Sequence, residues 1–449
     1  MTSLRADLRL AWELTRGSDR GEWWRVTLTA VGAALATGFA LAAVALASLR
    51  GGNYHVPVAS GLLNEPGTRS GVIAGLLLLL VPVVGFLGQC ARIGAVHRDR
   101  RLAGLRLAGA TPWQVRRIAA LETGLAGLLG SAVATVFSVL RLWDRPTALT
   151  WAGIALVAVA VPLLGAAAGA LALRRVVASP LGWVRRVAPR TGRGPGLLFL
   201  AGLLLVGAAA LFTLLSTSSA ASNRPSAGLP LTMVGVVLAV GAGSVWLSGA
   251  VAKGMGRLLA GRARSAAVLI AAERLRDDPW AAARTHAAVL LVTVVGTGFM
   301  GIREVFLDAV HSDESLTENL GYYTLGVDLT GAAVAVALAI TLSGLAVGTA
   351  ESMATRRRGL AAQAAAGVPR AVLGRSLLLE TALPLAPAVL LAGLGGTAIG
   401  TWYALLTGHP VPWVTALVPL AVYAACLLAA ATSLPLLGRS VRPGELRYA

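Results

Sequence analysis

The chain has 449 residues, of which 56% are hydrophobic and only 13% charged, and its mean hydropathy is +0.74. Soluble domains carry about 25% charged residues, so this composition argues against a single water-soluble domain. The net charge of +19 would by itself suggest nucleic acid as a partner, but in so apolar a chain it indicates another cause.

Ten runs of mostly apolar residues are long enough to cross a bilayer, which takes roughly 20 residues. They follow an amphipathic segment, residues 3–16, which is typical of a helix on the inner leaflet; the alternative is a solvated tail. Residues 265–276 repeat this segment before the seventh run. The predicted spans cover residues 26–48, 72–95, 118–140, 149–172, 196–215, 231–252, 284–302, 327–349, 377–402 and 412–436.

The basic residues predict the orientation of these spans. With the N-terminus in the cytoplasm, 33 of the 39 Lys and Arg fall inside and 6 outside. Cytoplasmic loops carry an excess of such residues, so both termini are predicted to be cytoplasmic. The net charge is then a record of topology, and no nucleic acid partner is expected. Arginine in place of lysine, with abundant Ala, Gly and Leu, is typical of a GC-rich bacterial genome.

The sequence contains an internal duplication. Residues 98–123 match residues 356–381 at ten of 26 positions, at an offset of 258 residues. The same offset places spans 2–4 onto spans 8–10, and an even number of spans separates the copies, so the repeats are parallel. The predicted fold is therefore an all-α integral membrane protein with two parallel four-helix repeats and a two-helix insert. The predicted regions are 1–25, a cytoplasmic amphipathic helix; 26–175, the first repeat; 176–260, a cytoplasmic loop and spans 5–6; and 261–449, the second amphipathic helix and repeat.

Each copy contains the same cytoplasmic motif between two spans. An arginine cluster is followed by a short helix, a glycine (Gly109 or Gly367) and, two or three residues later, a proline. Glycine ends a helix and proline suits the first turn of the next, so the spacing predicts a helix in or below the interface that can contact a cytoplasmic partner. The alternative, that the arginines only set topology, does not explain the repeated spacing.

A glutamate follows each motif at the membrane edge, Glu122 in the first copy and Glu380 in the second. They are expected either to pair with nearby Arg117 and Arg375 or to mark the joint between the cytoplasmic helix and the span.

The first copy resembles the FtsX-like permease domain of ABC transporters of the MacB/FtsX type, whose pattern is roughly R-E-I-G-x-L-R-A-L-G-A with a downstream Gln and Glu. It matches at Arg100, Leu105, Arg106, Gly109, Ala110, Gln114 and Glu122, and departs at Arg101 and Ala103. The second copy keeps Arg358, Gly367 and Glu380, while Gly359 and Ala364 replace family residues. The FtsX-like domains are expected at about 72–172 and 327–436.

The resemblance implies a permease subunit in the plasma membrane of a bacterium, in contact with membrane lipids. A separate cytoplasmic ABC ATPase, as a dimer on one copy of this chain, is expected to bind the ATP and to power export or extraction of a hydrophobic, lipid-like or peptide substrate. By the same resemblance, Arg100–Gln114 and Arg358–Val372 are the ATPase contacts. The implied coupling residues are Arg100, Arg106, Gly109, Gln114, Glu122, Arg358, Gly367 and Glu380. Residues 303–326 are too short for the large external domain of the peptide-resistance relatives.

No residues with catalytic, cofactor-binding or metal-binding spacing stand out. The only lysine, Lys253, lacks the phosphate-loop frame, the five histidines are scattered, and Cys90 and Cys426 lie far apart. Two alternative functions are a secondary transporter built from parallel repeats and a transmembrane signalling or scaffold protein. The first predicts ionisable residues deep in the spans, and the ten runs hold none at midplane.

Overall fold

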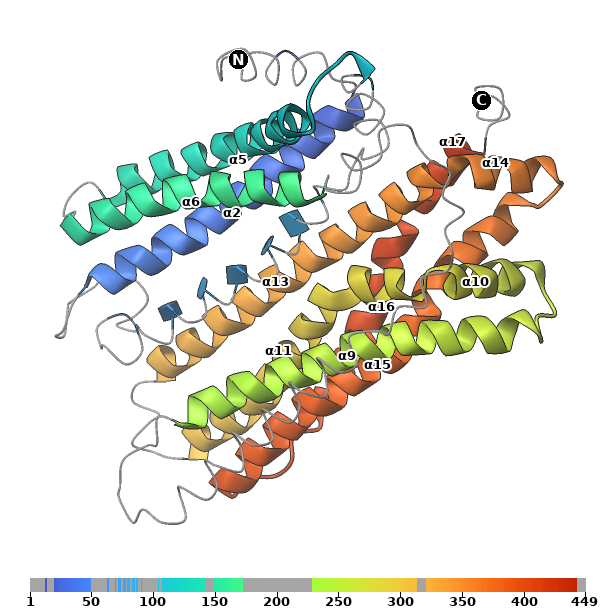
Figure 1. Ribbon diagram of the computed structural model, residues 1–449. Coiled ribbons are helices and arrows are strands. Elements are labelled where there is room, and N and C mark those ends of the chain that lie inside the picture. The colour runs from blue at the N-terminus through green and yellow to red at the C-terminus, as the bar shows by residue number, and fades with distance from the viewer. Residues whose placement is uncertain are drawn as a thin grey trace. The chain divides into compact units, whose positions relative to one another are not determined.

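The computed structural model describes residues 13, 20–49, 104, 107–142, 148–172, 228–312 and 320–441, together with isolated positions between 63 and 90. The regular structure throughout these residues is helical, and they contain no strand. The fifth predicted span and nearly all of the 3–16 segment lie outside the described residues. The all-α prediction is therefore confirmed for the part of the chain that the structure describes (Figure 1).

Seven helical segments in this part are long and apolar enough to cross a membrane. They coincide with the predicted spans 1, 3, 4, 7, 8, 9 and 10. They correspond to the helices α2 (Arg20–Ser48), α5 (Pro112–Leu142), α6 (Ala148–Ala172), α11 (Pro279–Ser312), α13 (Leu320–Thr355), α15 (Arg370–Thr407) and α16 (Leu417–Ala431). Helix α9 (Gly228–Ala260) covers the sixth predicted span. The chain is thus a multi-pass membrane protein, while the total of ten spans and the orientation stay predictions.

Large apolar side chains are exposed along α5 and α6, which is the pattern of helices that face lipid. Soluble proteins rarely expose apolar surface of this extent. The side chains include Leu129, Val133, Val136, Phe137 and Leu140 on α5, and Leu156, Val159, Leu163 and Leu164 on α6. In α11, by contrast, 56% of the residues in its apolar stretch are buried, so this helix lies in the protein interior.

The described residues form two compact units, residues 1–186 with 328–355, and residues 187–327 with 356–449. In the first unit α2 packs along α5, and α5 against α6. In the second unit α11 packs along α15, and α15 against α16. These are equivalent pairs in the two copies of the duplication, so the repeated sequence produces repeated packing.

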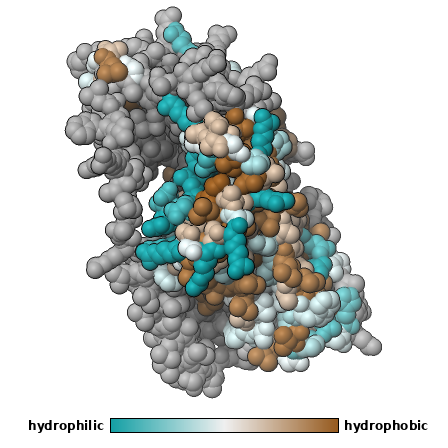
Figure 2. Space-filling view, turned by 90° about the vertical axis from the view of Figure 1, so that its right-hand side faces the viewer, coloured by the Kyte–Doolittle hydropathy of each residue, from teal (hydrophilic) through white to brown (hydrophobic). Residues whose placement is uncertain are grey.

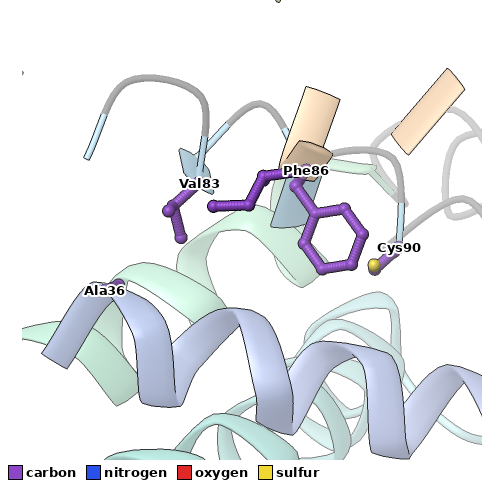
Figure 3. Close-up of a cluster of buried hydrophobic side chains, with 5 residues drawn as sticks. Ala36, Val83, Phe86 and Cys90 are labelled. Atoms are coloured by element: carbon purple, nitrogen blue, oxygen red, sulfur yellow. The ribbon is translucent and has the colours of Figure 1, made fainter. Parts of the chain in front are cut away.

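A buried apolar cluster lies in the first unit between α2 and the helical positions of the second predicted span. Ala36 of α2 lies below Val83, Phe86 and Cys90, and Ile340 of α13 completes the cluster (Figure 3). Both Val83 and Cys90 are fully buried. Residues 328–355 of α13 therefore belong to the core of the first unit, although they follow the second amphipathic helix in sequence.

Glycines allow α11 and α15 to approach closely in the second unit. A Cβ atom added at Gly396 would lie 2.6 Å from Cβ of Thr297 and 2.7 Å from the carbonyl oxygen of Val294. One helical turn further, Gly400 lies against Gly301. Small residues four apart are the usual means by which membrane helices pack backbone to backbone.

The inserted helix α9 is an integral part of the second unit. It packs against α11 and α15, and its last turns pack against α10 (Ala266–Asp277). Gly249 of α9 receives the ring of Trp280. Ser248 and His286, both buried, lie within hydrogen-bonding distance of each other, with Oγ and Nδ1 3.4 Å apart. The inserted helix α9 is thus held against α11 by the packing of Trp280 on Gly249 and by the polar contact between Ser248 and His286.

Replacement of Gly396 by alanine tests the close approach of α11 and α15. The added methyl group overlaps backbone atoms of α11, so we expect Gly396→Ala to destabilise the protein by about 1–3 kcal/mol, the usual cost of overpacking. Gly38→Ala in α2 is the matched control, because no heavy atom of the described residues lies within 4 Å of its added Cβ. Thermal unfolding in detergent measures both; equal melting temperatures would contradict the close packing.

Candidate functional site

The second cytoplasmic motif forms two helices joined by a tight turn, which we call the second elbow (residues 363–372). Helix α14 (Arg357–Ala365) ends before Gly367, whose φ is +90°, and α15 begins at Arg370 after Pro369. The amide of Gly367 donates to the carbonyl of Ala364 (3.0 Å), and the amide of Val368 donates to the backbone carbonyl of Gln363 (3.1 Å). These two bonds are those of a Schellman C-cap, so the glycine ends α14 as its sequence position predicts.

The first elbow (residues 107–114) uses the same backbone turn with a different cap. Gly109 has a φ of +97°, and α5 begins at Pro112. The amide of Thr111 donates to Oε1 of Gln114 (2.8 Å), and the amide of Gln114 donates to Oγ1 of Thr111 (3.2 Å). This reciprocal arrangement is a capping box, and it satisfies two amides at the start of α5.

The described coupling residues divide into an exposed group at or beside the elbows and a buried group further along the helices that follow them. Gly109, Gly367 and Arg358 are exposed, and Gln114 is partly buried by its role in the cap. Glu122 is 1% exposed, and the side chain of Glu380 is 15% exposed. Arg100 and Arg106 lie outside the described residues. The elbow and the glutamate of each motif therefore occupy different levels of the molecule.

Glu380 forms an ion pair with Arg356, the residue between α13 and α14. Nη1 of Arg356 donates to both carboxylate oxygens of Glu380, at 2.8 Å and 3.2 Å. The expected pairing with Arg375 is wrong: Arg375 precedes Glu380 by five residues, and side chains meet along a helix only at separations of three or four. The sequence signal for the pairing of Arg356 with Glu380 is that both residues recur in the first copy, as Arg98 and Glu122, at the offset of 258 residues.

A third charge, Arg274, belongs to the same site. It lies on α10, which begins at the N-cap Ser265 and buries Ala267, Ala271, Ala272 and Leu275. This apolar stripe packs against α9 and α15. Burial and the neighbouring Arg356 guanidinium lower the pKa of Arg274, whereas Glu380 and the aspartates that follow it on α10 raise it. Arg274 therefore interacts electrostatically with both members of the ion pair.

The exposed surfaces of the two elbows differ in chemistry. The first presents two large apolar side chains, Leu107 and Trp113, which are 71% and 67% exposed. At the second, the helix α14 that leads into the elbow presents Arg358, Ala362 and Ala365 along one face. Figure 2 looks onto the side of Figure 1 where α10 and α14 lie, and long hydrophilic side chains there alternate with apolar ones. A partner that binds both elbows meets an apolar contact at one and a basic contact at the other.

These features define a multi-pass membrane protein whose duplicated helical elbows continue directly into apolar helices. Residues 72–181, from the second predicted span past the end of α6, match the family described as FtsX-like permease C-terminal. This match supports the resemblance of the first motif to the FtsX-like permease family, whose members generally work with an ABC ATPase. No curated protein matches the chain.

The capping box at the first elbow makes a prediction about Thr111 and Gln114. Alanine at either position removes one bond and weakens the other, so we expect each substitution to cost about 1 kcal/mol. Because the two bonds act as a unit, the double variant should cost less than the sum. Gln114→Glu retains an acceptor and should unfold like the unaltered protein. Thermal unfolding followed by circular dichroism measures all four; strictly additive losses would contradict the cap.

Two glycines of the second motif should respond in opposite directions to alanine. Gly367 needs a positive φ, so Gly367→Ala should destabilise by roughly 1–2 kcal/mol. Gly359 lies inside α14 in open space, so Gly359→Ala should stabilise the helix by up to about 1 kcal/mol. Melting temperatures of the two variants test the pair, and a shift of the same sign in both would be inconsistent with the observed turn.

Proposed function

We propose that this chain is the transmembrane permease subunit of an ABC transporter in the plasma membrane of a bacterium. It couples ATP hydrolysis by a separate cytoplasmic ATPase to export or extraction of a hydrophobic, lipid-like or peptide substrate. The observation that supports this proposal best is the pair of exposed elbows, each the cytoplasmic end of a long apolar helix in an FtsX-like architecture.

The elbows are suited to transmit motion because each continues into one long helix. Helix α15 runs from Arg370 to Thr407 in 38 residues, which is about 57 Å at 1.5 Å per residue. The hydrocarbon core is about 30 Å thick, so one helix extends from the elbow to the far side of the bilayer. A displacement of the elbow therefore moves the outer end of the same helix.

Two elbows in one chain fit two ATPase subunits. The different surfaces, apolar at Leu107 and Trp113 and basic at Arg358, give the two ATPase contacts different chemistry. We assign no catalytic, cofactor-binding or metal-binding role to the chain itself, because ATP binding and hydrolysis belong to the partner.

Reversal of charge at the elbows tests the proposed ATPase contact. We expect the unaltered protein, purified from membranes of the organism that naturally produces it, to retain an ABC ATPase that mass spectrometry identifies. Arg358→Glu and Arg106→Glu should each weaken ATPase binding about tenfold, since interface arginines are often worth 1–2 kcal/mol. Arg276→Glu is the control, because Arg276 lies on α10 outside both elbows.

The proposal fails if no ATPase accompanies the unaltered chain under conditions that preserve the complex. Transport that depends on a proton or sodium gradient and continues without ATP would also contradict it, and would favour a secondary transporter.

A further inference from the structure

The ion pair between Arg356 and Glu380, which we call the basal ion pair, closes a helical hairpin. The chain leaves it along α14, turns at Gly367 and Pro369, and returns along α15 to Glu380. The elbow is the tip of this hairpin and the ion pair is its base. Leu360 on α14 and Leu373 on α15 are both buried. The pair is thus placed where α14 begins, at the other end of this helix from the turn at Gly367 and two residues before Arg358.

The basal ion pair differs in burial from the other ion pairs of the same unit. The side chains of Arg356 and Glu380 are 20% and 15% exposed, whereas Arg276 and Glu273 are 59% and 49% exposed. Exposed pairs contribute little to stability because water and salt screen them. Removal of one partner from a buried pair leaves an uncompensated charge in a poorly solvated place, which is costly. The basal pair therefore holds its helices together in a way that the surface pair does not.

Arg274 extends this contact to a third helix. Both charges of the basal ion pair act electrostatically on Arg274. Helix α10, which carries Arg274, is followed by Asp278 and then by α11. Helix α11 packs along α15 throughout the second unit. The ion pair therefore connects α14 to α15, and α15 in turn packs against both α10 and α11.

Arg356 lies at the point where the chain passes from the first compact unit to the second. Residues up to Thr355 group with the first compact unit, and residues from Arg356 onward group with the second. The basal ion pair thus fixes the first residue of the segment that returns to the second unit. Both charges recur in the first copy of the motif, as Arg98 and Glu122.

We infer that Arg356 and Glu380 are positioning residues for coupling: they fix α14 to α15 and α10, so that a push on the second elbow moves α15 and α11 as one body. This inference rests on the proposed function for the origin of the push. The fixing itself is a property of the chain alone and is testable without an ATPase.

Spin labels on α14 and α10 test whether the ion pair fixes the two helices. Cysteines replace Ala362 and Leu269, which are both exposed, and the native Cys90 and Cys426 are buried from the label. In lipid nanodiscs we expect a narrow distance distribution for the unaltered protein and a broad one for Arg356→Gln and Glu380→Gln. Arg356→Lys, which keeps the charge, should give an intermediate width, and Glu273→Gln should give the unaltered one.

A distribution in Glu380→Gln as narrow as in the unaltered protein overturns the inference. Arg356→Lys as broad as Arg356→Gln also overturns it, because the charge would then not be what fixes α14. Melting temperatures of the same samples confirm that each variant is folded at the temperature of the measurement.

The coupling part is tested with the ATPase bound. Glu380→Gln and Arg356→Gln should bind the ATPase as tightly as the unaltered chain, while the stimulation of ATP hydrolysis falls about five- to tenfold, within the range of measured couplings between sites. Loss of binding in proportion to loss of hydrolysis overturns a positioning role, because it shows a docking defect. If the unaltered chain binds no ATPase, the proposed function fails, and the spin-label distances alone decide whether the ion pair fixes α14.

Discussion

A helix that leaves the bilayer and returns must leave no backbone group unsatisfied at its ends, and the elbows depend on that constraint. The last carbonyls of one helix and the first amides of the next have no partner within their own helix. At the second elbow a glycine with φ of +90° supplies the C-cap bonds, and Pro369, which has no amide hydrogen, precedes α15. Since α15 continues from there across the membrane, the turn also sets the direction of the span.

The two copies of the motif keep this backbone and vary what is attached to it. The positive-φ glycine is present in both, but α5 starts with a capping box and α15 starts after a proline. The exposed side chains are apolar on one elbow and basic on the other. Duplication has therefore preserved the geometry that orients the helices, while the surfaces that meet a partner have diverged.

Local features of the structure could be predicted from the sequence, and long-range ones could not. Hydropathy located the spans because a bilayer imposes a length, and the Gly–Pro spacing located both elbows. The cap at Gln114 was readable from Thr-x-x-Gln, although the resemblance had assigned that residue to an ATPase contact. The partner of Glu380 needed tertiary structure, because Arg356 is 24 residues away and reaches it only when the hairpin closes. The grouping of α13 with the first unit also depends on packing between distant segments.

That grouping bears on how such a chain evolves. Residues 328–355 belong to the first unit, whereas the segments on both sides of them belong to the second, so the chain passes between units at each end of this stretch. A gene divided between the two repeats would leave Ala36, Val83 and Phe86 without Ile340. The two halves are copies in sequence but not separable parts. The first unit therefore needs a segment of the second repeat to complete its core.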